Sequence, residues 1–297
     1  MSAAAAVPCR VSPVPAVPVP PGTRDRLKSL GPWNFVEWML SKPGVLLTDT
    51  SLGDAARIHG VRAVAPHYAR LAPQLFSLEC RGGAASGGAR RGPEGDVWIR
   101  LRQLRAAIPG ILFQMPLCGP DRVGGAVRRV VVQAVENGVD LFRVSDPSNR
   151  IGGMRAAMEA AVDGGALCEG VLRYGADVRD GGLGYWAGLA RQLEQAGAHV
   201  VGIEDAAGTA CPRAIGALVR ALKGEVGLPL RFRARSAGDI ASVLAAVEAG
   251  CDVVDGVLEA AGGPASPPGL GSIVQALRGS GRDPQIDGAV LRTLRRP

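Results

Sequence analysis

The chain has 297 residues, is 47% hydrophobic but only 4% aromatic, and carries a formal net charge of +7. This composition predicts a large buried core and excludes extensive disorder, and no apolar run approaches the roughly 18 residues that a membrane span requires. The positive charge comes from dispersed arginines with little aromatic interleaving, which argues against a nucleic-acid partner.

Proline, alanine and valine dominate residues 1–28, which show no hydrophobic periodicity and are typical of an extended tail or linker. From residue 29 to residue 297, short apolar runs alternate with longer amphipathic segments. The apolar runs predict strands at 45–49, 75–80, 111–115, 140–144, 167–173, 199–204, 230–235 and 252–256. Strands that alternate with helices form parallel βαβ units. We therefore expect a Pro-rich tail followed by one α/β domain.

A short repeat suggests how these units close. The segments "ENGVDLF", "QAGAHVV" and "EAGCDVV" each join a helix end to a strand, and Gly138, Gly197 and Gly250 suit the left-handed cap between them. Eight such units, with no glycine-rich phosphate loop after the first predicted strand, favour a closed (β/α)8, or TIM, barrel over an open sheet. Such a barrel carries its chemistry at the carboxyl ends of its strands.

The six cysteines are scattered, without a CxxC motif or a cluster of cysteine and histidine. In a chain of this size that pattern indicates reduced thiols, and hence a cytoplasmic protein.

Several stretches carry a family resemblance: "GVLLTDTSLGDA", "YARLAPQLFSLECRGGA", "DLFRVSDPSN", "AGAHVVGIEDAAG" and "GLGSIVQALRGSGRDP". Together they resemble the carboxyltransferase domain of pyruvate carboxylase, from about residue 30 to residue 285. The resemblance implies a barrel that, in that family, holds a divalent metal and moves a carboxyl group between biotin and pyruvate.

The resemblance also places the family's four metal ligands. Asp54 matches the family's aspartate, but Glu204 stands where the family has a lysine that becomes carboxylated, and Arg233 and Arg235 stand where it has two histidines. A guanidinium group offers no lone pair to a metal and stays charged. We therefore expect no metal, and no cofactor, in this chain.

Further positions depart from the family pattern. Gly53 replaces an arginine, Arg57 replaces the glutamine that contacts pyruvate, and Cys118 replaces a second arginine. Ala265 takes the place of the threonine that the family uses to pass a proton. Arg143 is retained, yet no residue stands out as catalytic, and Cys118 has no neighbouring histidine to activate its thiol.

The segment "LPLRFRARSAG" allows two interpretations, because alternate residues of a strand share one face. In one, Arg233 and Arg235 pair with Asp54 and Glu204 in a charge-balanced cluster that replaces the metal. In the other, the mouth of the barrel binds an anion through a set of arginines, namely Arg57, Arg143, Arg231, Arg233 and Arg235.

These features predict a degenerate, metal-free pseudoenzyme that binds an anionic metabolite, such as a small carboxylate or phosphate, or a carboxylase partner. The alternative is a repurposed or residual pyruvate or oxaloacetate carboxyltransferase or decarboxylase. A homodimer is a further possible assembly, and neither nucleic acid nor membrane is an expected partner.

Overall fold

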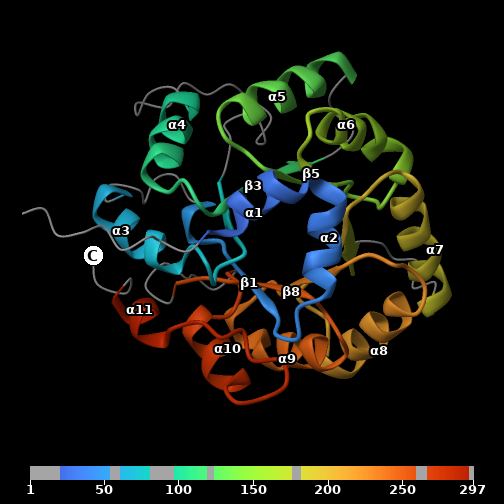
Figure 1. Cartoon of the computed structure of the whole chain (residues 1–297). Helices are drawn as coiled ribbons and strands as arrows, with labels where there is room; N and C mark the ends of the chain where they lie inside the picture. The colour runs from blue at the N-terminus through green and yellow to red at the C-terminus, as the bar shows by residue number, and fades with distance from the viewer. Residues whose placement is uncertain are drawn as a thin grey trace, which may run out of the picture.

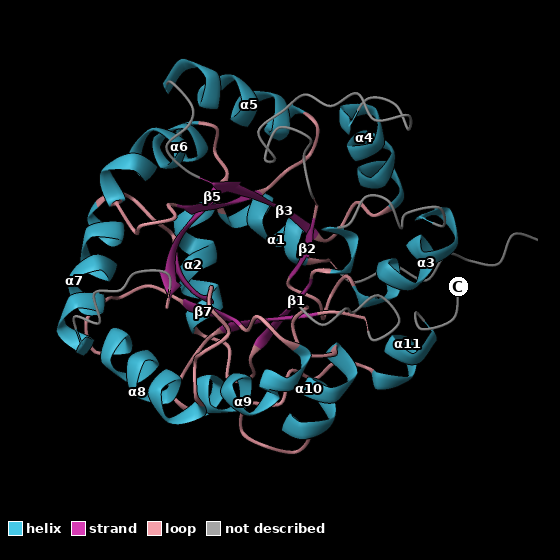
Figure 2. Ribbon diagram, turned by 180° about the vertical axis from the view of Figure 1, so that it is seen from behind, coloured by secondary structure: helices cyan, strands magenta, loops and turns pink. Residues whose placement is uncertain are grey.

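The computed structural model describes residues 21–53, 61–80, 97–118, 124–175, 182–258 and 266–293. Its strands form one closed, parallel barrel in which each strand pairs with the next in sequence and the last pairs with the first. The strands are β1 (Leu46–Asp49), β2 (Ser77–Glu79), β3 (Leu112–Cys118), β4 (Leu141–Ser145), β5 (Leu167–Tyr174), β6 (Val200–Asp205), β7 (Leu230–Arg233) and β8 (Val253–Gly256). Figure 2 shows this ring of strands inside a ring of helices. The predicted (β/α)8 barrel and the place of every predicted strand are confirmed.

The outer helices bury one apolar stripe each against the barrel. In α8, for example, Ile215, Leu218, Val219 and Leu222 are buried at helical spacing, and a proline occupies the first turn, where its missing N–H costs little. The outer helices are α3 (Val61–Leu71), α4 (Val97–Ala107), α5 (Gly124–Glu136), α6 (Ile151–Asp163), α7 (Gly182–Gln195), α8 (Pro212–Lys223), α9 (Ile240–Glu248), α10 (Leu270–Leu277) and α11 (Gly288–Thr293). Within the described ranges, every helix is too short or too polar to span a bilayer.

The glycines of the short repeat terminate their helices as predicted. Gly138, Gly197 and Gly250 have φ values of 98°, 85° and 105°, a region that favours glycine because it has no Cβ. Each lets the chain turn from a helix into the following strand.

Two further helices, α1 (Thr23–Leu30) and α2 (Pro32–Leu40), lie across the amino end of the barrel, at the centre of Figure 1. Leu27, Phe35 and Met39 pack there against apolar side chains from the strand starts, namely Phe76, Leu112, Leu141, Leu167, Val200 and Val253. The Thr23 hydroxyl also donates a hydrogen bond of 2.8 Å to the carbonyl of Phe76. We call the apolar side chains of α1, α2 and the strand starts named above the amino-end plug. Helix α1 thus begins inside the 1–28 range assigned to the tail, and residues 1–20 lie outside the described residues.

Candidate functional site inside the barrel

Above the amino-end plug, the barrel interior changes from apolar to charged. Strand β7 shows the cause: Leu230 and Phe232 belong to the core between strands and helices, whereas Arg231 and Arg233 contact side chains from other strands across the interior. Arg143 joins them from β4. Their partners come from β2, β5 and β8, and we call the six residues Glu79, Arg143, Glu169, Arg231, Arg233 and Asp255 the interior ion cluster.

Arg231 lies at the centre of this cluster and is fully buried. Its Nε donates to Asp255 Oδ1 at 2.8 Å, and its Nη2 donates to the same oxygen. Its Nη1 donates to Gln114 Oε1 at 2.7 Å and to Glu169 Oε2 at 3.1 Å. Every nitrogen of this guanidinium group is therefore used within the protein, as a buried charge requires.

Arg143 is the second buried cation, with 3% of its side chain exposed. Its Nε donates to Glu169 Oε1 at 3.0 Å, and its Nη1 lies 3.5 Å from Glu79 Oε2. Burial lowers the pKa of Arg143, but the neighbouring carboxylates, led by Glu169 and Asp255, outweigh burial and leave the pKa raised. Arg143 is therefore permanently charged.

Arg233 closes the cluster on the side of the mouth. Its Nη1 and Nη2 donate to the two carboxylate oxygens of Glu79, the second at 3.2 Å, in a two-pronged pair. Burial raises the pKa of Glu79, but Arg233, followed by Arg143 and Arg231, more than compensates and lowers it to about 2. The Gln114 amide adds a hydrogen bond of 3.2 Å to the same carboxylate.

The charges of the cluster cancel, with three guanidinium groups facing three carboxylates. An isolated buried charge costs several kcal/mol, and removal of one partner from a buried pair costs about 3–5 kcal/mol. The packing depends on one glycine, because a Cβ at Gly202 would lie 2.3 Å from Glu169 Oε1. The cluster is thus closely fitted around Glu169.

The other predicted site residues lie nearer the mouth or outside the described residues. Glu204 ends 3.8 Å from Arg143 Nη2 and its side chain is 32% exposed. Arg235 is exposed, and its Nη1 donates to the Ala206 carbonyl at 2.6 Å. Gly53 ends a 3-10 turn after β1, and Cys118 is exposed at the end of β3. Outside the described residues are Asp54, Arg57 and Ala265.

Of the proposed cluster of Arg233 and Arg235 with Asp54 and Glu204, Asp54 lies outside the described residues, and within the described residues the two arginines have other partners. Arg233 binds Glu79 and lies 3.5 Å from Asp255, while Arg235 binds a backbone carbonyl. Sequence reasoning missed Glu169 and Gln114 as site residues. Each is a polar residue at an inward position of an otherwise apolar run, and that pattern could have identified them.

The chemistry of these side chains does not fit a divalent cation. Of the four positions that the family resemblance associates with the metal, three are described, and they hold one carboxylate and two guanidinium groups. No cluster of three or more histidine, cysteine, aspartate or glutamate side chains with room for a metal occurs in the described part of the chain. Guanidinium groups at contact distance would repel a divalent ion rather than coordinate it.

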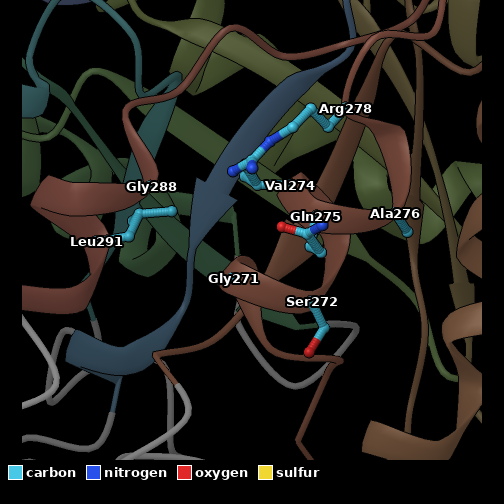
Figure 3. A pocket seen from close by; sticks show the side chains of 8 residues that line it. All are labelled: Gly271, Ser272, Val274, Gln275, Ala276, Arg278, Gly288 and Leu291. Carbon is cyan, nitrogen blue, oxygen red and sulfur yellow. The ribbon is translucent and has the colours of Figure 1, made fainter.

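A cavity of about 540 Å³ lies elsewhere, on the outer surface between α10 and α11. Figure 3 shows its lining, in which Gln275 and Arg278 are the long polar side chains. None of the predicted site residues lines this cavity, so the barrel interior is the stronger candidate for function.

A parallel eight-stranded barrel with a polar interior toward the carboxyl ends of its strands defines a protein of the TIM-barrel class. No family model matches the chain. The chain is 37% identical to human mitochondrial pyruvate carboxylase over 94% of its own length, and 34% identical to pyruvate carboxylase of Bacillus subtilis (strain 168) over 90%.

Its structure resembles the carboxyl transferase domain of Rhizobium etli pyruvate carboxylase solved with pyruvate, with a TM-score of 0.88 and 39% sequence identity over 95% of this chain. The chain is therefore a homologue of the carboxyltransferase domain of pyruvate carboxylases. It spans only about a quarter of the curated relatives, 26% and 25%, and about half, 51%, of that solved chain.

Proposed function

We propose that this carboxyltransferase-domain homologue is a metal-free pseudoenzyme that acts by binding an anionic metabolite or a carboxylase partner. The observation that carries the proposal is the interior ion cluster. Its arginines neutralise the buried carboxylates that would otherwise attract a cation.

Loss of the metal follows from the identity of the side chains rather than from a small displacement. Arg233 binds both oxygens of Glu79, and a guanidinium group stays charged at any physiological pH. A divalent ion would have to break this pair and then remain beside two uncompensated cations. Carboxyl transfer of the kind named for the relatives needs chemistry that these residues do not supply.

Binding to a carboxylase partner is supported by the identity of the relatives. They are pyruvate carboxylases, of which this chain corresponds to about a quarter, so the partner that we propose is a carboxylase of that kind. A second copy of this chain is the other partner that we propose.

The alternative, a residual pyruvate or oxaloacetate activity, needs cationic groups at both the carboxylate and the carbonyl of the substrate. Arg231 donates through all three nitrogens and Arg143 Nε binds Glu169, so among the described residues of the cluster's centre only the Nη edge of Arg143 is left for an anion. Binding without turnover therefore accounts better for the arrangement of charges.

Metal analysis of the purified protein tests this proposal. We expect far less than one zinc, manganese or magnesium per chain, and no chelator-sensitive decarboxylation of oxaloacetate. The double variant Arg233→His/Arg235→His, once its fold is verified by its melting temperature, should gain zinc affinity by about ten-fold, because imidazole supplies lone pairs. A stoichiometric metal in the wild-type protein would contradict the proposal.

A further inference from the structure

The interior ion cluster is tightly hydrogen-bonded around Arg231 and more loosely paired around Arg143. Around Arg231 the donor–acceptor distances are 2.7–3.1 Å, apart from the shorter pair of its Nη2 with Asp255. Around the Nη atoms of Arg143 they are 3.5–3.8 Å. Separations of this size exceed a direct hydrogen bond. The Nη groups of Arg143 and the carboxylates that face them, which we call the upper layer, are therefore loosely paired within the described part of the chain.

One donor in this upper layer stands out. Arg143 Nη2 is buried and has no hydrogen-bond partner among the described residues. The acidic group facing it is Glu204, whose Oε2 lies 3.8 Å away and whose side chain is 32% exposed. A buried guanidinium donor therefore points toward a carboxylate that reaches the solvent.

We propose that Glu204 is a displaceable carboxylate that covers a binding subsite for a small oxyanion on Arg143 Nη2. The ligand class is the carboxylate or phosphate group of a small molecule, because a guanidinium edge recognises such oxygens. This inference deepens the proposed function, since it names the group through which an anionic metabolite binds.

The charges explain why Glu204 has to leave before an anion enters. With Glu204 included, the ion pairs contain four carboxylates and three guanidinium groups, so this set of described residues already carries one excess negative charge. A second anion beside Glu204 would meet repulsion in a region that screens charge poorly. An anion that replaces the carboxylate of Glu204 leaves the balance unchanged.

The side chain of Glu204 is suited to such a displacement. It extends from β6 next to Arg233 in the β6–β7 register, at the carboxyl end where ligands enter barrels of this class. By contrast, Glu169 is fully buried and held by two arginines. Glu204 is thus the acidic residue in these ion pairs that is able to turn toward solvent.

The variant Glu204→Gln tests the subsite, with Glu248→Gln on the exposed face of α9 as the matched loss of one negative charge. In calorimetric titrations with inorganic phosphate and, separately, sodium acetate at low ionic strength, we expect Glu204→Gln to bind at least one of them about ten-fold more tightly than the wild type. The two titrations distinguish a phosphate from a carboxylate ligand. Glu248→Gln should match the wild type. An equal affinity in all three proteins would overturn the proposal.

A second change locates the anion. Arg143→Lys in the Glu204→Gln background should return the affinity to the wild-type value, because lysine lacks the Nη2 donor. If this variant melts too early for titration, a crystal structure of Glu204→Gln with the anion replaces it, and an anion away from Arg143 Nη2 refutes the site. Metal analysis of the wild type and anion titration of the variant are independent measurements, so the proposed function and this subsite can fail separately.

Discussion

The two ends of the barrel interior are filled by opposite chemistries. At the amino end, α1 and α2 press leucine, phenylalanine and methionine side chains onto the apolar strand starts. A few residues along the same strands, three guanidinium groups and three carboxylates fill the interior. Apolar packing is non-directional and accommodates changes of shape, whereas the ion cluster requires each donor to meet its acceptor. The comparison predicts that similar substitutions have very different costs at the two ends.

The largest effect is expected from Arg231→Met. The methionine fills most of the arginine's volume but leaves Asp255 and Glu169 buried with reduced compensation, so the free energy of unfolding should fall by about 3–5 kcal/mol. Arg235→Met, at an exposed position, should change it by less than about 0.5 kcal/mol. Denaturant titration of the two variants measures both. Equal effects would mean that the cluster does not stabilise the fold as described.

At the amino-end plug, the size of a side chain should matter more than its exact shape. Met39→Ala leaves a cavity and should cost about 2–4 kcal/mol, whereas Met39→Leu should cost less than about 1.5 kcal/mol. The corresponding conservative change in the cluster, Arg231→Lys, loses donors and should cost more than Met39→Leu. Thermal melts of the three variants rank them. A Met39→Leu variant less stable than Arg231→Lys would reverse the comparison.

A smaller change in the free energy of unfolding is expected from pH, and it should fall in a different pH range for each end of the barrel interior. Next to the amino-end plug, His199 stacks on Trp33 with ring centroids 4.6 Å apart and accepts a hydrogen bond of 3.0 Å from the backbone N–H of Cys168. Burial lowers the pKa of His199 from 6.5 to about 4. Between these values the unfolded chain binds a proton that the folded chain does not, so stability should fall by about 2 kcal/mol as the pH drops from 6.5 to 4.

The cluster should respond at lower pH. Because the pKa of Glu79 is lowered from 4.5 to about 2, its contribution is complete above pH 4.5 and is lost as the pH falls toward 2. Denaturant titrations between pH 7 and pH 2.5 separate the two windows. His199→Asn keeps an acceptor near the position of Nδ1 but does not titrate. It should remove the pH dependence of stability between pH 6.5 and 4 and leave the dependence at lower pH unchanged. A slope that persists between pH 6.5 and 4 in His199→Asn would assign the effect to another group.

The sequence was sufficient to predict the barrel because its signals are local. Short apolar runs and the glycines at 138, 197 and 250 report on neighbouring residues, and they place every strand correctly. The start of α1 was missed because "TRDRLKSL" follows a long Pro/Val/Ala segment and has only weak apolar periodicity. The helix is fixed by contacts with residues distant in sequence, such as the ion pair of Arg24 with Asp140 at 2.8 Å.

The candidate site was predictable only in part, for the same physical reason. The alternation in β7 correctly indicated that arginines 231 and 233 share a face, but it carried no information on which acids they meet. Closure of the barrel brings Glu79 of β2 to Arg233 of β7, and Glu169 of β5 to both Arg143 and Arg231. Which charge meets which depends on the register across the whole ring.

The spread of the ion cluster along the chain has a consequence for the order of synthesis. Glu79, Arg143 and Glu169 emerge from the ribosome well before Arg231 and Arg233, which are the last cations of the cluster. A nascent chain that stops before β7 holds two carboxylates of the cluster, and Glu204 beside them, against a single guanidinium group, and its ring of strands is still open. The segment that contains β7 and β8 therefore supplies both the last two strands of the ring and the remaining guanidinium groups, so the ring and its charge balance are completed together.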